Sequence, residues 1–89
     1  MKSASLRVTF KQGRAYVAYY SLPHDSRDSS VRCEKFEPDL VVDFNADGRP
    51  IGIEIITPEA VTVSRFNRVL RKLGLPPVTK KELAPLHAA

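Results

Sequence analysis

The chain has 89 residues, of which 43% are apolar and 27% are charged, and its formal net charge at pH 7 is +4. This composition is typical of a folded globular protein and excludes a disordered chain, while the length allows one domain. No apolar run approaches the roughly 18 residues that a membrane-spanning helix needs, and the N-terminal stretch lacks the apolar segment of a secretory signal. One cysteine excludes an internal disulfide and a cysteine-based zinc site, so we expect a cytoplasmic protein with no cofactor.

The positive charge is concentrated in the last third of the chain. Residues 1–59 carry eight Lys or Arg and nine Asp or Glu, whereas residues 60–89 carry six Lys or Arg and a single acid. We therefore divide a single domain of residues 1–89 into a β-hairpin core over 6–57 and a basic helical tail over 58–89.

Residues 6–10 and 15–20 each show a period of two, which is typical of β-strands, and Gly13 between them supplies the positive φ of a tight turn. This pattern predicts a first hairpin. Its expected pairs are Phe10 with Ala15, Val8 with Val17 and Leu6 with Tyr19. In this register Tyr16 and Tyr20 lie together on the outer face, away from the core.

A polar segment that contains proline follows the first hairpin. Residues 21–30 have no period and predict an exposed loop. Val31 and Cys33 then begin a short third strand that ends at Pro38, and we expect Cys33 to fill space in the core.

Residues 40–44 and 51–55 form the clearest strand pair, because apolar side chains alternate on both sides of the polar turn Asn45–Gly48. Two registers remain open, one that pairs Phe44 with Ile51 through a two-residue turn and one that pairs Val42 with Ile51 through a four-residue turn. A three-residue turn is excluded unless a β-bulge intervenes. Both open registers place Ile53 in the core and Glu54 on the opposite face.

From about Ser64 the period changes to that of a helix. One face carries Phe66, Val69, Leu70 and Leu73, and the opposite face carries Arg65, Arg68, Arg71 and Lys72. Gly74 suits the left-handed residue that follows a helix. Residues 58–63 are left open between a single turn and a longer helix, because their β-branched members disfavour a helix. Thr79 and Glu82 have the spacing of a capping box, which predicts a final short turn.

The turn of the second hairpin matches a calcium-binding pattern. Asp43, Asn45, Asp47 and Gly48, with Glu54 beyond them, have the spacing of an EF-hand loop. That loop requires a helix on each side, whereas both flanks here have the period of strands, which carries Glu54 roughly 20 Å from the turn. We interpret the segment as a polar β-turn and predict no metal site.

His24 and Glu54 are the residues that would serve an enzyme. The segment His24-Asp25-Ser26 contains the residue types of a hydrolytic triad, but three successive residues do not converge on one another as a triad does. An acid within an apolar strand, such as Glu54, suits a general base or, as we prefer, the solvent face of a sheet. No catalytic residue is therefore assigned, and His87 is expected to be frayed.

Two surfaces are candidates for binding. The outer face of the predicted sheet carries more apolar surface than a small monomer usually exposes, which favours a homodimer about a two-fold axis. The candidate interface residues are Tyr16, Tyr20, Val41 and Ile56. The cationic face of the tail, formed by Arg65, Arg68, Arg71 and Lys72, suits an acidic protein surface or the phosphates of a nucleic acid, or else is only solvated.

At the second hairpin the sequence resembles the DUF2283 family of short prokaryotic proteins of unknown function. The resemblance rests on residues 42–55 (VDFNADGRPIGIEI), of which Gly-Ile-Glu-Ile is the specific part, and Tyr16 and Tyr19 stand where the aromatic residues of the first hairpin are expected. Basic residues occupy the first turn, where acids are usual in the family. The resemblance implies a compact antiparallel fold and transfers no catalytic residue. Some relatives look like antitoxin-type partners of small toxins, which implies a protein partner.

These patterns together predict an α+β fold, with a five-stranded antiparallel sheet made of two hairpins and a linking strand. One C-terminal helix over 64–73 is expected to pack on the face that carries Val8, Val42 and Ile53. The leading function is a non-enzymatic protein-interaction module that forms a homodimer, with an antitoxin-like role as the implication of the resemblance. The alternative is a nucleic-acid-binding protein that acts through the basic C-terminal helix, and the third is a small enzyme. No membrane partner is predicted.

Overall fold

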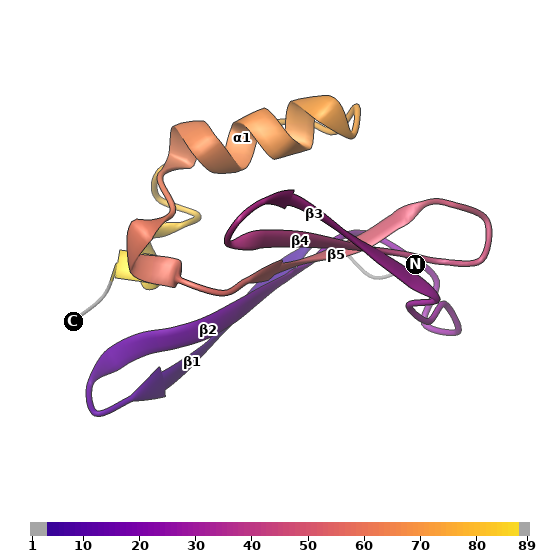
Figure 1. The fold of residues 1–89 in the computed structure, drawn as a ribbon. Helices are drawn as coiled ribbons and strands as arrows, with labels where there is room; N and C mark the ends of the chain where they lie inside the picture. Colours follow the sequence, from indigo (N-terminus) through magenta and orange to yellow (C-terminus); the bar gives the residue numbers. More distant parts are fainter. Residues whose placement is uncertain (1–3, 88–89) are drawn as a thin grey trace.

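The computed structural model describes residues 4–87, which form a five-stranded antiparallel sheet and one α-helix (Figure 1). Its elements are β1 (Ser5–Lys11), β2 (Arg14–Ser21), β3 (Arg32–Glu37), β4 (Leu40–Phe44), β5 (Pro50–Ile55), the 3₁₀ turn η1 (Pro58–Ala60), the helix α1 (Val63–Lys72) and the 3₁₀ turn η2 (Ala84–His87). The predicted α+β class is confirmed. In this part of the chain no helix is both long enough and apolar enough to cross a membrane.

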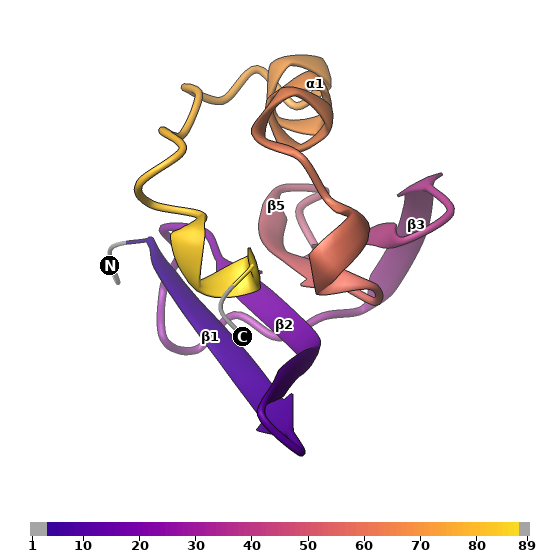
Figure 2. The same cartoon turned by 90° about the vertical axis from the view of Figure 1, so that its left-hand side faces the viewer.

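The strands follow the order β1-β2-β5-β4-β3, so the two hairpins join through β2 and β5. The linking strand β3 therefore lies at an edge, beside β4, and β5 takes the centre of the sheet. The helix α1 and the turn η2 lie on one side of the sheet, and none of the described helical segments covers the other side (Figures 1 and 2).

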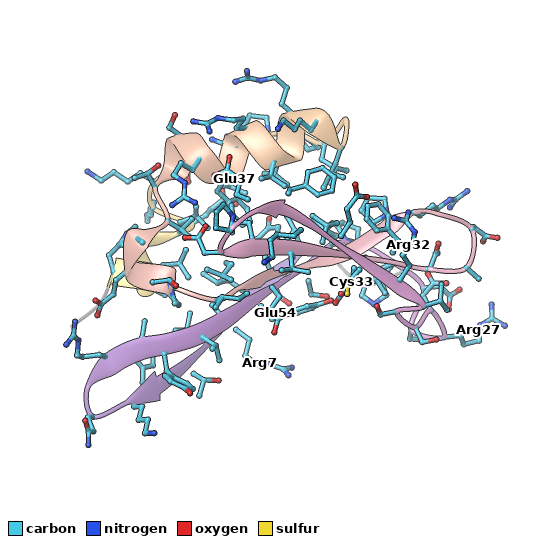
Figure 3. The ribbon with its side chains drawn as sticks, viewed as in Figure 1. Arg7, Arg27, Arg32, Cys33, Glu37 and Glu54 are labelled. Atoms are coloured by element: carbon cyan, nitrogen blue, oxygen red, sulfur yellow. The ribbon has the colours of Figure 1, made fainter. Side chains whose placement is uncertain are left out.

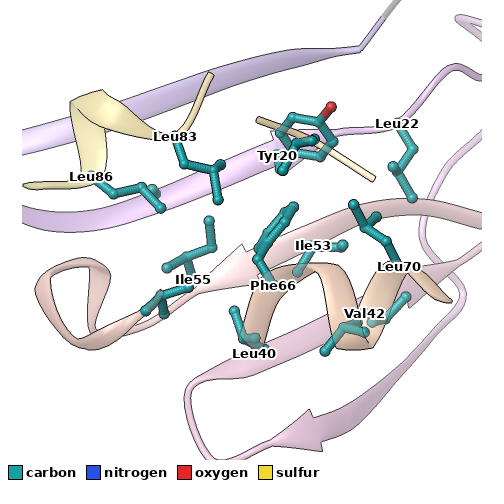
Figure 4. Packing of buried hydrophobic residues seen from close by; sticks show 14 of the residues in the cluster. Tyr20, Leu22, Leu40, Val42, Ile53, Ile55, Phe66, Leu70, Leu83 and Leu86 are labelled. Atoms are coloured by element: carbon teal, nitrogen blue, oxygen red, sulfur yellow. The ribbon is translucent and has the colours of Figure 1, made fainter. Parts of the chain in front are cut away.

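The core fills the space between the sheet and α1 (Figure 4). Its largest fully buried side chains include Leu40, Val42, Ile53, Ile55, Val61, Phe66, Val69, Leu70, Leu83 and Leu86. The rings of Tyr20 and Phe66 meet edge to face with their centroids 5.2 Å apart, which links β2 to the helix. The predicted apolar face of the helix and the burial of Ile53 are confirmed, and Val8 packs against the same cluster.

The first hairpin contains a β-bulge that the period-two pattern did not predict. The pair of Phe10 with Ala15 is confirmed, and Gly13 has the predicted positive φ, at 77°. Beyond the bulge between Thr9 and Phe10, however, the pairs are Thr9 with Val17, Val8 with Ala18, Arg7 with Tyr19 and Leu6 with Tyr20. The predicted pairs of Val8 with Val17 and of Leu6 with Tyr19 are therefore wrong. One extra residue on β2 exchanges its two faces, because side chains alternate at every position.

The exchange of faces decides where the tyrosines of β2 lie. Tyr20 turns to the core side and is only 8% exposed, so its predicted place on the outer face is wrong. Tyr19 takes the outer side instead, opposite Glu54 of β5.

The second hairpin keeps the register predicted for a two-residue turn along most of its length. The observed pairs are Leu40 with Ile55, Val41 with Glu54, Val42 with Ile53 and Asp43 with Gly52. A second bulge then pairs Phe44 with Pro50 in place of Ile51, and the chain reverses through five residues. Asn45 closes this turn, since its Oδ1 accepts the backbone N–H groups of Asp47 (3.0 Å) and Arg49 (2.9 Å).

The tail begins with a single turn, which settles the alternative left open for residues 58–63. The helix α1 starts after Thr62, whose hydroxyl accepts the N–H of Arg65 at 3.1 Å, and it ends before Gly74, where φ is 73°. Asn67, within the helix, exchanges two side-chain hydrogen bonds with the backbone of Val78, which lies beyond it, at 3.0 and 2.8 Å.

The C-terminal segment returns to the sheet. The predicted capping box is confirmed, because Glu82 Oε1 accepts the N–H of Thr79 at 3.1 Å and Thr79 Oγ1 accepts the N–H of Glu82 at 3.2 Å. The prediction that His87 is frayed is wrong, because its Nε2 lies 2.7 Å from the carbonyl oxygen of Val61. This contact ties the end of the tail to the start of the helical region.

Two expectations about the segment between the hairpins are wrong. Leu22 lies within the predicted exposed loop, yet it is 4% exposed and belongs to the core. Cys33 was expected to fill space in the core, yet it is exposed. Cys33 lies opposite Asp43, and the register gives both residues to the outer side of the sheet.

Candidate functional site: the open face of the sheet

The side of the sheet away from α1 carries a row of five side chains, one from each strand. Cross-strand partners share a face, so the registers place these residues together in the order Arg7, Tyr19, Glu54, Val41 and Lys35. A second row beside it consists of Ser5, Ser21, Gly52, Asp43 and Cys33. We call these ten residues the open face. Figure 3 shows Arg7 and Glu54 below the sheet, on the side opposite the helix.

Tyr19 crosses from β2 to β4 over the central strand. Its hydroxyl donates to Asp43 Oδ2 at 3.0 Å, although β5 lies between the two strands. The ring has room because residue 52 is glycine, since a Cβ there would lie 1.8 Å from Tyr19 Oη. Tyr19 thus fastens three strands together and forms an ordered aromatic surface at the middle of the open face.

The environment of Tyr19 determines its charge state. Burial, and then the hydrogen bond to Asp43, raise the pKa of the Tyr19 hydroxyl well above its ordinary value of 10.0. At neutral pH Tyr19 is therefore a neutral donor and does not serve as a base.

The charged residues of the open face have both signs. Arg7 and Lys35 stand at the two ends of the first row, and Glu54 lies between them. Among the described residues 4–87, none of these three side chains forms an ion pair within the chain. Arg7, Glu54, Val17 and Tyr19 are among the residues that line a hollow of about 130 Å³. The two cations balance the two acids, so the open face has no net charge.

The four predicted interface residues do not lie on one surface. Val41 is half-buried and lies in the first row of the open face, whereas Tyr20 lies in the core. Tyr16 (57% exposed) and Ile56 (44% exposed) line a separate hollow near the turn of the first hairpin. The ammonium group of Lys11 lies 5.2 Å from the centre of the Tyr16 ring.

The predicted cationic face of α1 is only partly free. Arg65 reaches the connection between β3 and β4, where its Nε donates to Glu37 Oε1 at 2.9 Å and its Nη1 donates to Asp39 Oδ2 at 3.2 Å. A second contact joins Arg65 Nη2 to Asp39 Oδ1, and Arg68 Nη1 donates to the other oxygen of Glu37 at 3.0 Å. Arg71 and Lys72 remain exposed. Two of the four predicted cations therefore fasten the helix to the sheet.

The carboxylates in this network were not predicted from the sequence, because no spacing rule joins residues 26 to 31 positions apart. Hydrogen bonding to Arg65 and the positive charge of Arg68 hold the pKa of Glu37 below its ordinary value of 4.5. Glu37 is 11% exposed and Asp39 12% exposed at their side chains, so these two carboxylates are largely shielded from solvent, whereas the side chain of Arg68 is 52% exposed.

The residues considered for catalysis or metal binding do not converge. His24 Nδ1 donates to the carbonyl oxygen of Leu22 at 2.5 Å, and Asp25 pairs with Arg27 instead of with His24. In the described part of the chain, no group of three or more His, Cys, Asp or Glu side chains is arranged to hold a metal ion. His24 and Asp25 therefore each contact a residue two positions away, within the segment between β2 and β3.

Comparison with known proteins finds a family model that is similar to part of the chain. Residues 15–57 match the family model described as "Protein of unknown function (DUF2283)", which agrees with the resemblance stated from the sequence. The matched segment runs from β2 through β5 and contains Tyr19, Asp43, Gly52 and Glu54, but it includes neither β1 nor the helical tail. No curated protein and no solved structure matches the chain.

Proposed function

We propose that this protein is a non-enzymatic interaction module that binds a second copy of itself through the open face. The observation that carries this proposal is that none of the described helical segments covers the open face, while Tyr19 on it is held in a fixed position. An interface gains most from large side chains that are already ordered, because little conformational entropy is then lost on binding.

The composition of the open face favours a protein partner. Tyr19 and Val41 provide apolar area near the middle, while Arg7, Glu54 and Lys35 provide charges that form no ion pair with any residue of the described segment 4–87. A surface with balanced charges can complement a copy of itself, whereas a nucleic acid requires an excess of cations. The same face lacks such an excess.

The helical tail supports the nucleic-acid alternative less than its sequence implied. Arg65 and Arg68 are held by Glu37 and Asp39, so they cannot contact phosphates without breaking ion pairs that fasten the helix. Arg71 and Lys72 alone would form a small phosphate-binding patch. We therefore prefer self-association, which also serves an antitoxin-like protein that presents its tail to a further partner.

Sedimentation equilibrium at micromolar concentration tests the proposal. We expect twice the chain mass for the wild type and a shift toward the single-chain mass for Val41→Asp, which buries a charge in the apolar part of the interface. Ser64→Asp is the matched control, since it adds the same charge at an exposed position on α1, on the other side of the sheet. It should leave the dimer unchanged.

A wild-type chain that stays monomeric up to hundreds of micromolar would contradict self-association. Equal effects of Val41→Asp and Ser64→Asp would show instead that net charge, and not the open face, controls assembly.

A further inference from the structure

We infer that two copies pack open face to open face about a two-fold axis near Tyr19, so that Arg7 of each copy pairs with Glu54 of the other. This inference rests on the proposed function and adds to it the register and the charged contacts that select the partner.

The order of the first row supplies the geometry. Arg7 and Glu54 lie on the two sides of Tyr19, on the strands β1 and β5 that flank β2. Each lies about 4.8 Å from β2, which is the distance between neighbouring strands of a sheet. A two-fold axis that runs along β2 in the plane of the interface therefore exchanges the two positions. It brings the position of Arg7 over that of Glu54 twice and the Cα of Tyr19 over its copy once, while each Tyr19 ring leans over β5 toward Asp43.

This arrangement agrees with the way sheets pack. Two sheets stacked face to face keep their strands aligned to within about 30°, which an axis along β2 allows. An axis across the strands would instead place Arg7 on Arg7 and Glu54 on Glu54, and like charges in contact strongly disfavour a complex. The charges of the row thus distinguish between the two orientations.

The hollow lined by Arg7 and Glu54 explains why these two groups are free for the partner copy. The two side chains line the walls of this 130 Å³ space and do not close it with an ion pair. A guanidinium group has a planar fork that binds both oxygens of a carboxylate, so Arg7 suits Glu54 in both distance and geometry. Tyr19 between them is fixed by Asp43 and gives the contact a defined centre.

A competing register places the axis near Val41 and pairs Glu54 with Lys35 instead. Lys35 stands on the far side of Glu54 in the same row, at the same number of strands from it as Arg7. We prefer the first register because Arg7 has the forked geometry and because Tyr19 is a larger and more rigid anchor than Val41. Charge reversal separates the two registers.

The experiment measures dimerisation of Arg7→Glu and Glu54→Arg separately and as an equimolar mixture. Each variant alone creates two like-charge contacts and should raise the dimer dissociation constant at least about 100-fold. The mixture restores both opposite-charge contacts in a heterodimer, so the dimer should reappear. Rescue on mixing also proves that both variants are folded.

The matched control mixes Lys35→Glu with Glu54→Arg. In the proposed register Lys35→Glu alone dimerises like the wild type, because its Arg7 and Glu54 are unchanged. It forms no heterodimer with Glu54→Arg, because one of the two contacts would then join two cations. A Lys35→Glu variant that is monomeric alone and forms a dimer with Glu54→Arg would overturn the Arg7 register in favour of the one centred on Val41.

The results separate failure of this inference from failure of the proposed function. If the wild type is a dimer and Arg7→Glu is one too, or if the two variants form no heterodimer on mixing, the register is wrong and self-association still holds. A monomeric wild type would overturn both. If Arg7→Glu does not fold, Arg7→Gln replaces it and should weaken the dimer at least about tenfold through the loss of two charge-assisted contacts.

Discussion

Tyr19 on β2 and Asp43 on β4 are joined by a 3.0 Å hydrogen bond that crosses the intervening strand over Gly52. This contact explains why glycine stands in the most buried strand of the protein, between Ile51 and Ile53. A glycine inside a strand often marks a place where another group approaches the backbone closely, and here that group is the ring of Tyr19. The Gly-Ile-Glu-Ile segment alternates between the two sides of the sheet. Gly52 and Glu54 belong to the open face, whereas Ile53 and Ile55 are buried in the core.

Replacing Gly52 by alanine should destabilise the protein by about 1–3 kcal/mol, because the new methyl group displaces the Tyr19 ring and breaks its bond to Asp43. The backbone at residue 52 does not have a positive φ, so alanine itself causes no backbone strain. In a Tyr19→Ala background the same substitution should be nearly neutral or slightly stabilising. Urea denaturation of the four chains of this double-mutant cycle measures the difference. Additive effects would mean that the clash is relieved elsewhere.

Ile53→Ala should cost about 2–5 kcal/mol, which is enough to unfold or nearly unfold a domain of this size. Ile53 is fully buried at the centre of the sheet, whereas its neighbour Glu54 is exposed. Glu54→Ala should therefore cost less than about 1 kcal/mol when it is measured at a concentration at which the chain is monomeric. Chemical denaturation followed by circular dichroism gives both values. The reverse order would place β5 out of register by one residue.

Glu37→Gln should destabilise the protein at neutral pH, and its effect should disappear in acid. The pKa of Glu37 is lowered in the folded state, so its carboxylate stabilises the fold above the ordinary value of 4.5, and this stability is lost as the pH falls through the lower folded-state pKa. Thermal unfolding of wild type and variant between pH 7 and pH 2 should show converging midpoints. In an Arg65→Gln background the pH-dependent part should shrink, since Arg65 is the main cause of the shift. A constant difference across the pH range would exclude the ion pair as its source.

Calcium should not bind at the turn of the second hairpin, despite the spacing of its acids. Asn45 Oδ1 already accepts two backbone N–H groups, and Asp43 Oδ2 accepts the hydroxyl of Tyr19. Glu54 lies along β5, opposite Val41, where it cannot fold back to the turn. Calorimetry with millimolar calcium should give only the heat of dilution. Saturable binding of one ion per chain would contradict this interpretation.

Local rules explain the parts of the fold that could be predicted from the sequence. Alternation of apolar residues located the strands of both hairpins, and the helical period located α1 with its buried face of Phe66, Val69 and Leu70. Gly13, Gly74 and the capping box of Thr79 were predictable for the same reason, because a turn or a helix end depends on residues only a few positions apart.

The bulges, the partners of Arg65 and the open face depended on the tertiary structure. A bulge adds one residue without breaking the period that reveals a strand, so the sequence by itself placed a tyrosine pair on β2 but not the face that each occupies. Only the docking of α1 on one side drew Tyr20 against Phe66 and left Tyr19 outside. Burial acts on the whole sheet at once, and it selects the register in which the largest apolar area is removed from water.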